Sequence, residues 1–173
     1  MSARVSVVMG SDSDLSVMIE ACSVMDQLGI KSETAIISAH RTPHRAAEFA
    51  EGAADRGIEV IIAGAGGAAH LPGVLAALTE LPVIGVPVRS SSLDGLDSLL
   101  SIVQMPRGIP VATVGIDNAR NAGLLAARII GVADREIRSR LAEYRSRMEA
   151  GVVAKADELT DKGPTQYLRD HAK

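Results

Sequence analysis

Five short apolar runs recur along this chain, and segments with helical periodicity separate them. The runs are residues 5–9 (VSVVM), 33–37 (ETAII), 59–64 (EVIIAG), 82–88 (PVIGVPV) and 109–116 (IPVATVGI). Their apolar residues are continuous rather than alternating, which is typical of parallel strands that helices cover on both faces. Because strands and helices alternate, the connections are expected to be right-handed crossovers, and the chain is predicted to form an α/β fold.

Apolar spacing and helix-terminal residues predict the helices between these runs. Thr42 and Pro43 look like an N-cap and a first helical residue, and that helix should end near Gly57. Four further helices are expected over residues 14–28, 73–78, 96–104 and 118–130, and the last of them is rich in small residues. Five strands alternating with these helices favour a flavodoxin-like doubly wound five-stranded parallel sheet, with a C-terminal helical extension.

A long polar helix is predicted from about residue 134 onward. Its apolar stripe comprises Ile137, Leu141, Tyr144 and Met148. The sequence leaves open whether this stripe packs on its own domain or reaches a neighbouring subunit. We therefore divide the chain into an α/β catalytic domain, residues 1–133, and a C-terminal helix and tail, residues 134–173. The final segment DKGPTQYLRDHAK contains helix breakers, so we expect it to fray or to dock elsewhere.

Composition limits the functions open to the chain. Its 173 residues are 47% hydrophobic and 23% charged, so one folded domain is expected. A formal net charge of −3 and a scarcity of aromatic side chains argue against nucleic-acid binding, which needs a basic face or a stacking platform. The apolar runs are too short and too glycine-rich to span a bilayer, and the N-terminus lacks a signal-peptide pattern. Cys22 is the single cysteine, which suits a reducing compartment, so a cytoplasmic protein is expected.

Polar side chains follow the first three apolar runs at their carboxyl ends. They are GSDSD at residues 10–14, SAHR at residues 38–41 and GAGGAAH at residues 64–70. In a doubly wound sheet, ligands bind beyond the carboxyl ends of the strands, where the winding reverses. With the strand order 2-1-3 these three segments are neighbours, so we expect them to form one site.

The segment GSDSD has a functional and a structural interpretation. Gly10 allows a ligand to approach the backbone, while Ser11 and Ser13 offer hydroxyls at a helix N-terminus, where an anion such as phosphate is favoured. Asp12 or Asp14 would accept hydrogen bonds from sugar hydroxyls. Alternatively, the segment is only a turn with an N-cap.

The strongest candidates for chemistry are His40 and Arg41. Histidine exchanges a proton near neutral pH, and arginine binds a carboxylate or a phosphate through two hydrogen bonds. A loop histidine that makes only structural hydrogen bonds is the alternative for His40. His44 stands four residues away, but Pro43 lies between the two histidines and no third ligand is evident, so no metal site is expected.

The segments after the third and fourth runs are harder to interpret. Gly64, Gly66 and Ala69 satisfy the dinucleotide pattern G-x-G-x-x-G/A, but they do not follow the first strand and no acidic residue ends the next one. We prefer a loop of backbone amides that leaves room for a small ligand, with His70 as a lesser candidate for proton transfer or for a structural hydrogen bond. Residues 90–116 form either a solvated loop with a short helix, or a wall of the pocket or a subunit contact.

Five collinear segments together resemble the class I N5-carboxyaminoimidazole ribonucleotide mutases of de novo purine biosynthesis. They are VVMGSDSDLSVM, SAHRTP, AGAGGAAHLPGV, PVIGVPV and LDSLLSIVQMPRGIPVATV, and the resemblance covers about residues 4–131. It implies an isomerase that moves a carboxylate from the exocyclic nitrogen of an aminoimidazole ribonucleotide to a ring carbon, without ATP, metal or organic cofactor. It also implies a homo-oligomer, expected to be an octamer.

The resemblance assigns residues to the site as well. Ser11, Asp14 and Arg41 match substrate-binding positions. Ser38 lines the same site, and His40 matches the general acid/base. We further expect the substrate to be lined by Gly10, Ala65, Gly66, Gly67, His70 and Leu71. The mechanism usually drawn for the family releases carbon dioxide inside a closed site, recarboxylates the ring carbon and removes its proton.

Two other functions are weighed against this one. The class II relatives carboxylate aminoimidazole ribonucleotide directly with carbon dioxide, although SAHRTP and GAGGAAHLP are the class I forms of the motifs. The second alternative is a non-catalytic nucleotide-binding or sensor domain, since a fold does not fix a function. The adjacent His40 and Arg41 argue against such a domain, because binding alone does not require a titrating group.

Overall fold

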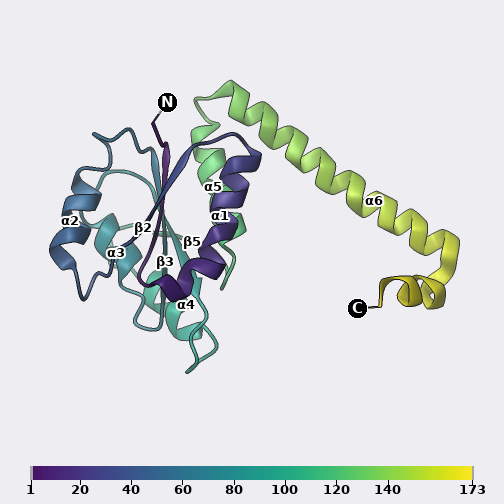
Figure 1. The fold of residues 1–173 in the computed structure, drawn as a ribbon, viewed down its shortest axis with the longest axis horizontal. Helices are drawn as coiled ribbons and strands as arrows, with labels where there is room; N and C mark the ends of the chain where they lie inside the picture. Colours follow the sequence, from purple (N-terminus) through teal and green to yellow (C-terminus); the bar gives the residue numbers. More distant parts are fainter. Residues whose placement is uncertain (1, 173) are drawn as a thin grey trace.

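The computed structural model describes residues 2–172 and contains one five-stranded parallel sheet (Figure 1). Its strand order is β2-β1-β3-β4-β5, so the expected doubly wound, flavodoxin-like arrangement is confirmed. The strands are β1 (Val5–Met9), β2 (Ser32–Ile36), β3 (Val60–Gly66), β4 (Val83–Val88) and β5 (Ala112–Thr113). Within residues 2–172, no helix combines the length and the apolar character that crossing a membrane requires.

β5 is much shorter than the strand predicted at residues 109–116. Only two of its residues pair with β4. Pro87 of β4 accepts a hydrogen bond from the Asp117 N–H at 2.8 Å, but it has no N–H of its own to return. The ladder therefore ends early, and the chain follows β4 up to Asp117 without regular pairing.

Helices cover both faces of the sheet, as Figure 1 shows. α1 and α5 pack on one face and α2 and α3 on the other, while α4 follows β4. Their bounds are α1 (Leu15–Gln27), α2 (Pro43–Glu51), α3 (Leu71–Ala76), α4 (Leu96–Val103) and α5 (Ala119–Ile130). Two clusters of buried apolar side chains fill the spaces between the sheet and the two helix layers, which explains why the strands are apolar without alternation.

α2 begins where the sequence predicts and ends earlier. Pro43 is its first residue, but the helix stops at Glu51, and turns fill the interval up to Gly57. Gly57 has a φ of +89°, and this left-handed conformation directs the chain back toward β3. Thr42 occupies the N-cap position, as predicted, although its side chain makes no capping hydrogen bond.

The small residues of α5 let this helix lie close to α1. A Cβ atom at Gly123 would lie 3.1 Å from the Val24 Cβ and 3.2 Å from the Ala21 carbonyl oxygen. The other small residues on this face are fully buried: Ala119, Ala122, Ala126 and Ala127. Close helix packing within one chain therefore explains the small-residue composition of this segment.

α6 (Arg135–His171) begins against α5 and then projects away from the body of the protein (Figure 1). The Asp134 carboxylate caps it by accepting hydrogen bonds from two N–H groups of its first turn. Ile137 and Tyr144 of the predicted stripe are buried, whereas Met148 is 50% exposed. The stripe therefore packs on its own domain through Ile137, Leu141 and Tyr144, and Met148 lies beyond this contact.

The final segment is helical, whereas the sequence predicts that it frays or docks elsewhere. Gly163 interrupts α6 with a φ of +71° and a ψ of 158°, and Pro164 follows at the start of a last helical piece that folds back (Figure 1). Lys162 binds Asp170 across this bend at 2.7 Å. The helix breakers thus turn the helix instead of ending it. Lys173 lies outside the described residues.

Gly64→Ala is expected to destabilise the protein by about 1–3 kcal/mol through overpacking. A Cβ atom at Gly64, the first glycine of the dinucleotide-like pattern, would lie 2.3 Å from the Sδ of Met18, which is fully buried. Chemical denaturation should show a lower midpoint with an unchanged slope. Gly115→Ala is the control, since the new Cβ would meet only the Asn118 Cβ at 3.9 Å. Equal midpoints for the two variants would contradict this packing.

Candidate functional site

The three polar segments meet around one cavity at the carboxyl edge of the sheet. Its volume is about 530 Å³, which is within the range of small-ligand sites. All of the expected site residues except Gly67 line it: Gly10, Ser11, Asp14, Ser38, His40, Arg41, Ala65, Gly66, His70 and Leu71. The register explains this convergence, because Met9 of β1 pairs with both Ile36 of β2 and Gly64 of β3. Three strands therefore release their loops at the same level.

The segment after β1 forms a short 3-10 helix, η1 (Asp12–Asp14), with Ser11 as its N-cap. The Ser11 hydroxyl accepts a hydrogen bond from the Ser13 N–H at 3.4 Å. The Gly10 N–H donates to the Gly64 carbonyl at 3.1 Å, which anchors the loop to β3. The turn with an N-cap is therefore present, and the same residues also line the cavity.

Asp14 is a buried carboxylate in the cavity wall, with 7% of its surface exposed. Burial raises the pKa of Asp14, because the charged form loses its hydration. Hydrogen bonds from the Ser13 hydroxyl at 3.2 Å and from the backbone N–H groups of Ser11 and Gly10 oppose this shift. The hydrogen bonds within the protein therefore offset only part of the cost of burying the Asp14 carboxylate. A ligand hydroxyl would donate a further hydrogen bond to it.

Ser38 organises the turn SAHR after β2. Its carbonyl accepts hydrogen bonds from the N–H and the hydroxyl of Thr42, both at 2.9 Å. Its hydroxyl accepts from the Arg41 N–H at 3.2 Å and lies 3.5 Å from the Arg41 Nε. The Arg41 Nη2 also donates to the Gly10 carbonyl at 3.5 Å. The turn thus holds the guanidinium between the loops that follow β1 and β2.

A second cavity, of about 420 Å³, adjoins the first. The residues common to both are Gly10, Ser11, Ser38 and Arg41. Arg45 of α2 lines the second cavity and was not predicted, although it follows Arg41 at helical spacing. Asp12 is the single carboxylate among the described residues that line this cavity. Two guanidinium groups beside serine hydroxyls suit a phosphate.

His40 and His70 are in direct contact within the main cavity. The His40 Nε2 and the His70 Nδ1 are 2.7 Å apart, and the rings are nearly perpendicular, at 89° with centroids 4.9 Å apart. One of these two nitrogens must donate its proton while the other accepts it, so each ring fixes the tautomer of the other. His44, the other histidine of this region, lines neither cavity.

The loop after β3 uses three of its amides inside the chain. The N–H groups of Ala69 and His70 donate to the carbonyls of Gly67 and Ala68, both at 2.8 Å. The Gly67 N–H donates to the Ser98 hydroxyl at 2.8 Å. These three amides are therefore engaged within the chain, while the loop lines the cavity and leaves room for a ligand, as expected.

Ser98 of α4 holds this loop in place and was not predicted. Its side chain is fully buried, and its hydroxyl donates to the Val88 carbonyl at 2.6 Å while accepting from Gly67. The hydroxyl of Ser101, on the same helix, lies 2.7 Å from the Asp97 carbonyl oxygen and 3.3 Å from the Gly67 carbonyl oxygen. A serine inside an apolar helix carries no sequence signal for this contact, because its partners come from two other segments.

Three residues after β4 also line the main cavity: Arg89, Ser90 and Ser91. Hydrogen bonds to Asp94 and Asp117 raise the pKa of Arg89, so this side chain stays charged. The start of the segment after β4 is therefore a wall of the pocket. Applying the strand-end argument to the fourth strand as well as to the first three would have identified these residues.

Comparisons with known proteins agree with the predicted family. Residues 4–151 match the AIR carboxylase family. The chain is 59% identical over 165 residues to an N5-carboxyaminoimidazole ribonucleotide mutase from Thermotoga maritima, covering 95% of this chain and 96% of that protein. It is 56% identical over 172 residues to a phosphoribosylaminoimidazole carboxylase from Candida albicans, covering 99% of this chain but 30% of that longer protein.

The fold is shared with a solved relative. The crystal structure of Treponema denticola PurE aligns with a TM-score of 0.82 and 30% sequence identity, over 91% of this chain and 98% of that chain. Sequence and fold thus agree over most of the α/β domain and the site that it carries. This chain belongs to the AIR carboxylase family.

Proposed function

We propose that this chain is an N5-carboxyaminoimidazole ribonucleotide mutase, which isomerises its substrate to 4-carboxy-5-aminoimidazole ribonucleotide in de novo purine biosynthesis. The mutase from Thermotoga maritima, which matches over almost the full length of both chains, supports this proposal. The structural observation that carries it is the contact between His40 and His70 in a cavity that Arg41 also lines. A proton-exchanging pair beside an anion-binding group is what a carboxylate transfer on a nucleotide requires.

The substrate has a phosphate, ribose hydroxyls and a carboxylate, and the site offers a group for each. Arg41 and Arg45, with the Ser38 hydroxyl, would bind the phosphate through charge-assisted hydrogen bonds. Asp14 would accept hydrogen bonds from the ribose, which explains why a costly buried carboxylate is present. Arg89 lines the main cavity while paired with Asp94 and Asp117, and Ser90 and Ser91 beside it offer hydroxyls to the substrate carboxylate.

His40 is the proposed general acid and base. When the bond between the exocyclic nitrogen and the carboxylate carbon breaks, its electron pair stays on the nitrogen, which takes a proton from His40, and carbon dioxide is released. The ring carbon then attacks carbon dioxide, and the proton on that carbon returns to His40. Protons and electrons balance without a cofactor, because His40 regains in the second step the proton that it gives up in the first, and the contact with His70 would hold the His40 ring in place.

We further propose that the protein works as a cytoplasmic homo-oligomer, with eight subunits as the expected number, and without a nucleic-acid or membrane partner. A released carbon dioxide molecule must be kept in the site until it is attacked. In the single chain His40, Arg41 and His70 are all exposed. A neighbouring subunit over this edge of the sheet would close the site.

Direct carboxylation of aminoimidazole ribonucleotide by carbon dioxide is the second candidate. The family description and the Candida albicans relative, both named as carboxylases, favour it. The two reactions share the later half of the proposed mechanism, so the same site residues serve either one. The substrate that the enzyme accepts separates them.

The decisive experiment is a direct assay of the purified protein. N5-carboxyaminoimidazole ribonucleotide is supplied without ATP and without added bicarbonate, and the carbon-carboxylated product is followed through a coupled enzyme. Rapid product formation is expected from the mutase. Product that forms only from aminoimidazole ribonucleotide with abundant carbon dioxide would establish the carboxylase instead. If neither substrate gives product, the chain would be a non-catalytic nucleotide-binding domain.

His40→Asn is expected to lower kcat by about 10²–10⁴-fold, because the general acid and base is lost while a polar side chain remains. The substrate dissociation constant, measured by calorimetry, should stay within about threefold, since charged groups elsewhere hold the phosphate and ribose. His44→Asn is the matched control and should retain the wild-type rate, because His44 lines neither cavity. A wild-type rate in His40→Asn would remove His40 from the mechanism.

Arg41→Ala is expected to weaken substrate binding by about 10–100-fold, the effect of losing a hydrogen-bonded charge. Titration calorimetry with the substrate, or with inorganic phosphate as a competitor, would measure it. Arg169→Ala removes an exposed arginine that lies in α6, away from the α/β body, and should leave affinity unchanged. Equal affinities for the two variants would place the phosphate elsewhere.

Asp14→Asn is expected to make the protein more stable and less active. Because burial raises the pKa of Asp14 above its ordinary value of 3.8, the folded state keeps a proton that the unfolded chain releases. Wild-type stability therefore falls as the pH rises from 3.8 through the raised pKa, and asparagine avoids that loss. Thermal unfolding should show a higher unfolding temperature for Asp14→Asn than for the wild type at pH 7, and this difference should vanish well below pH 3.8.

Asp12→Asn provides the control for this variant. Asp12 is the exposed neighbour, so its replacement should leave the unfolding temperature at pH 7 unchanged. A stabilised Asp14→Asn enzyme with full substrate affinity would show that the buried carboxylate does not serve the ribose. A destabilised variant would show that its hydrogen bonds outweigh the cost of burial.

A further inference from the structure

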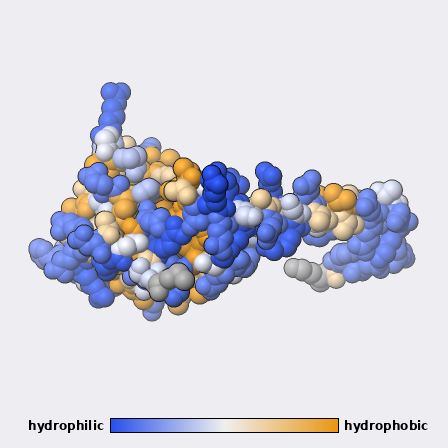
Figure 2. Space-filling view, turned by 90° about the horizontal axis from the view of Figure 1, so that it is seen from above, coloured by the Kyte–Doolittle hydropathy of each residue, from blue (hydrophilic) through white to orange (hydrophobic). Residues whose placement is uncertain are grey.

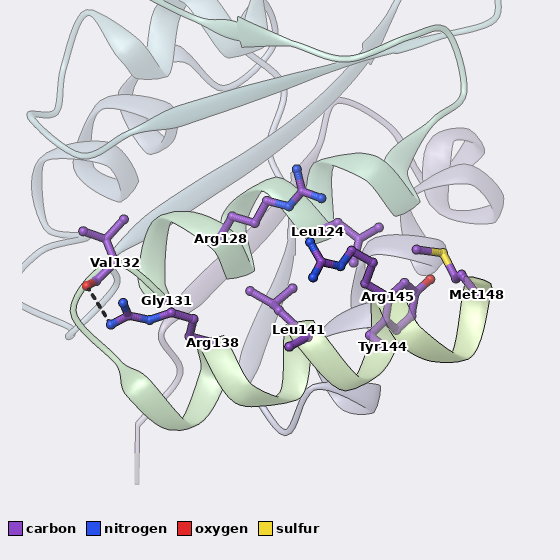
Figure 3. Close-up of a pocket in the computed structure, with 10 residues that line it drawn as sticks. Leu124, Arg128, Gly131, Val132, Arg138, Leu141, Tyr144, Arg145 and Met148 are labelled. Carbon is purple, nitrogen blue, oxygen red and sulfur yellow. Dashed lines mark hydrogen bonds between the residues drawn. The ribbon is translucent and has the colours of Figure 1, made fainter. Parts of the chain in front are cut away.

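The groove between α5 and the start of α6 is larger than the main cavity but lacks its chemistry (Figure 3). Its volume is about 660 Å³, and Leu124, Leu141 and Met148 contribute apolar surface to it. Neither a histidine nor a carboxylate is among the described residues that line it. A residue that supports proton transfer without touching the substrate should therefore act on the main cavity, where His40 and His70 lie.

α4 turns an unusual face toward the sheet. Its buried residues are Ser98 and Ile102, and both are fully buried, whereas Leu96 and Leu100 are 49% and 42% exposed. Figure 2 shows hydrophobic side chains scattered among hydrophilic ones over the surface of the body, so exposed leucines are ordinary in this protein. The buried serine is the informative residue, because burying a hydroxyl is costly unless it forms hydrogen bonds.

The hydrogen bonds of Ser98 join two segments that line the main cavity. β3 and β4 pair as far as Gly66 and Val88, and Val88 directly precedes the cavity wall formed by residues 89–91. The Ser98 hydroxyl donates to the Val88 carbonyl oxygen at 2.6 Å and accepts from the Gly67 N–H at 2.8 Å. One buried hydroxyl therefore continues the connection between the two strands past the end of their ladder.

The loop after β3 depends on α4 for its hydrogen bonds to other segments. The Ser101 hydroxyl lies 3.3 Å from the Gly67 carbonyl oxygen, although it is closer to the Asp97 carbonyl oxygen of its own helix, at 2.7 Å. In the chain described from residue 2 to residue 172, residues 67–69 make no hydrogen bond to another segment except through Ser98 and Ser101. Ser98 provides the shorter of these two contacts.

Close packing fixes α4, and with it Ser98, on β4. A Cβ atom at Gly85 would lie 2.4 Å from the Ile102 Cγ2, so this side chain presses directly on the backbone of the strand. Ile102 follows Ser98 by four residues, which places the two side chains on the same face of the helix. The packing that holds Ile102 therefore also determines where the Ser98 hydroxyl lies.

The loop that Ser98 holds leads to His70. Hydrogen bonds from Ala69 to Gly67 and from His70 to Ala68, both of 2.8 Å, make the chain between them a compact turn. A shift at Gly67 would therefore be passed on to the His70 ring, whose Nδ1 lies 2.7 Å from the His40 Nε2. A displacement of about 1 Å would break this contact, because hydrogen bonds do not extend to such a separation.

We propose that Ser98 is a positioning residue of the reaction: through Gly67 it keeps His70 in contact with His40, and it does not touch the substrate itself. This role rests on the proposed function and deepens it. Ser98 is not among the residues that line the cavity. The loops after β1 and β2, which would hold the phosphate and the ribose, make no hydrogen bond to it. Loss of its hydroxyl should therefore slow the proton transfers while substrate binding stays nearly unchanged.

Ser98→Ala and Ser6→Ala are a matched pair of variants that test this role. Ser6 and Ser98 are the fully buried serines of the described chain, but the Ser6 hydroxyl bonds to Glu33 at 2.6 Å, and neither of these two residues lines the cavity. Each variant loses one buried hydroxyl, so both should unfold at a temperature lower by roughly 2–10 °C. Well below that temperature, Ser98→Ala should lower kcat by about 10–100-fold. Its substrate dissociation constant should stay within about threefold. Ser6→Ala should keep the wild-type kcat and affinity.

Chemical modification provides a second readout that needs no turnover. Diethyl pyrocarbonate acylates the free lone pair of a neutral imidazole. In the contact between His40 and His70 one ring uses that lone pair as the acceptor, so this ring should react slowly. Ser98→Ala should raise its rate of modification by about threefold or more, as mapped by mass spectrometry. The rate at His44 is the internal reference and should not change, and Ser6→Ala should retain the wild-type rates at all three histidines.

Ser98→Cys serves in case Ser98→Ala does not fold. A thiol is only a weak donor and acceptor, so both readouts should move in the same direction by a smaller amount. Unchanged kcat and unchanged histidine modification in a folded Ser98 variant would overturn the proposal, and so would an equal loss of kcat in Ser6→Ala. If the wild-type protein turned over neither nucleotide, the proposed function would fail, while the modification rates would still show whether Ser98 holds the two rings together.

Discussion

The parallel register of β2, β1 and β3 is the constraint on which the rest of the structure depends. Met9 is level with Ile36 on one side and with Gly64 on the other, so three loops of different chemistry begin at one height. A slip of one residue in any of these strands would turn its side chains to the opposite face of the sheet. The apolar packing that stabilises the sheet therefore also decides which polar side chains meet beyond it.

Much of this arrangement can be predicted from the sequence, because its determinants are local. Continuous apolar runs identify buried parallel strands, and the helix signals between them fix the winding. Once the order is known, the strand-end rule brings GSDSD, SAHR and GAGGAAH together without any further information. The family resemblance then identifies His40 and Arg41 as the residues to examine, although their roles stay predictions.

The parts that could not be predicted depend on partners distant in the chain. The sequence favours His40 over His70 because nothing in it indicates that the His40 Nε2 and the His70 Nδ1 lie 2.7 Å apart. Ser98 looks like an ordinary helical serine until Gly67 and Val88 are placed beside it. Residues 109–116 look like a full strand in the sequence. The residue that ends their pairing early is Pro87, which lies on the neighbouring strand β4 and lacks an N–H. Gly163 and Pro164 signal a break, but nothing in the sequence indicates that the helix resumes after it and that Lys162 pairs with Asp170 across the bend.

Because α6 is long and straight, the direction in which each side chain at its far end points depends on how many residues precede it. From Arg135 to the bend at Gly163 the helix extends roughly 40 Å, and each residue adds about 1.5 Å of length and about 100° of rotation. A single inserted residue at Gly151 would swing Leu159 to another side of the helix while leaving every contact of the α/β body intact. Insertions and deletions, rather than substitutions, are therefore the changes that would most sharply reorient the exposed side chains of α6 while leaving the cavity residues unchanged.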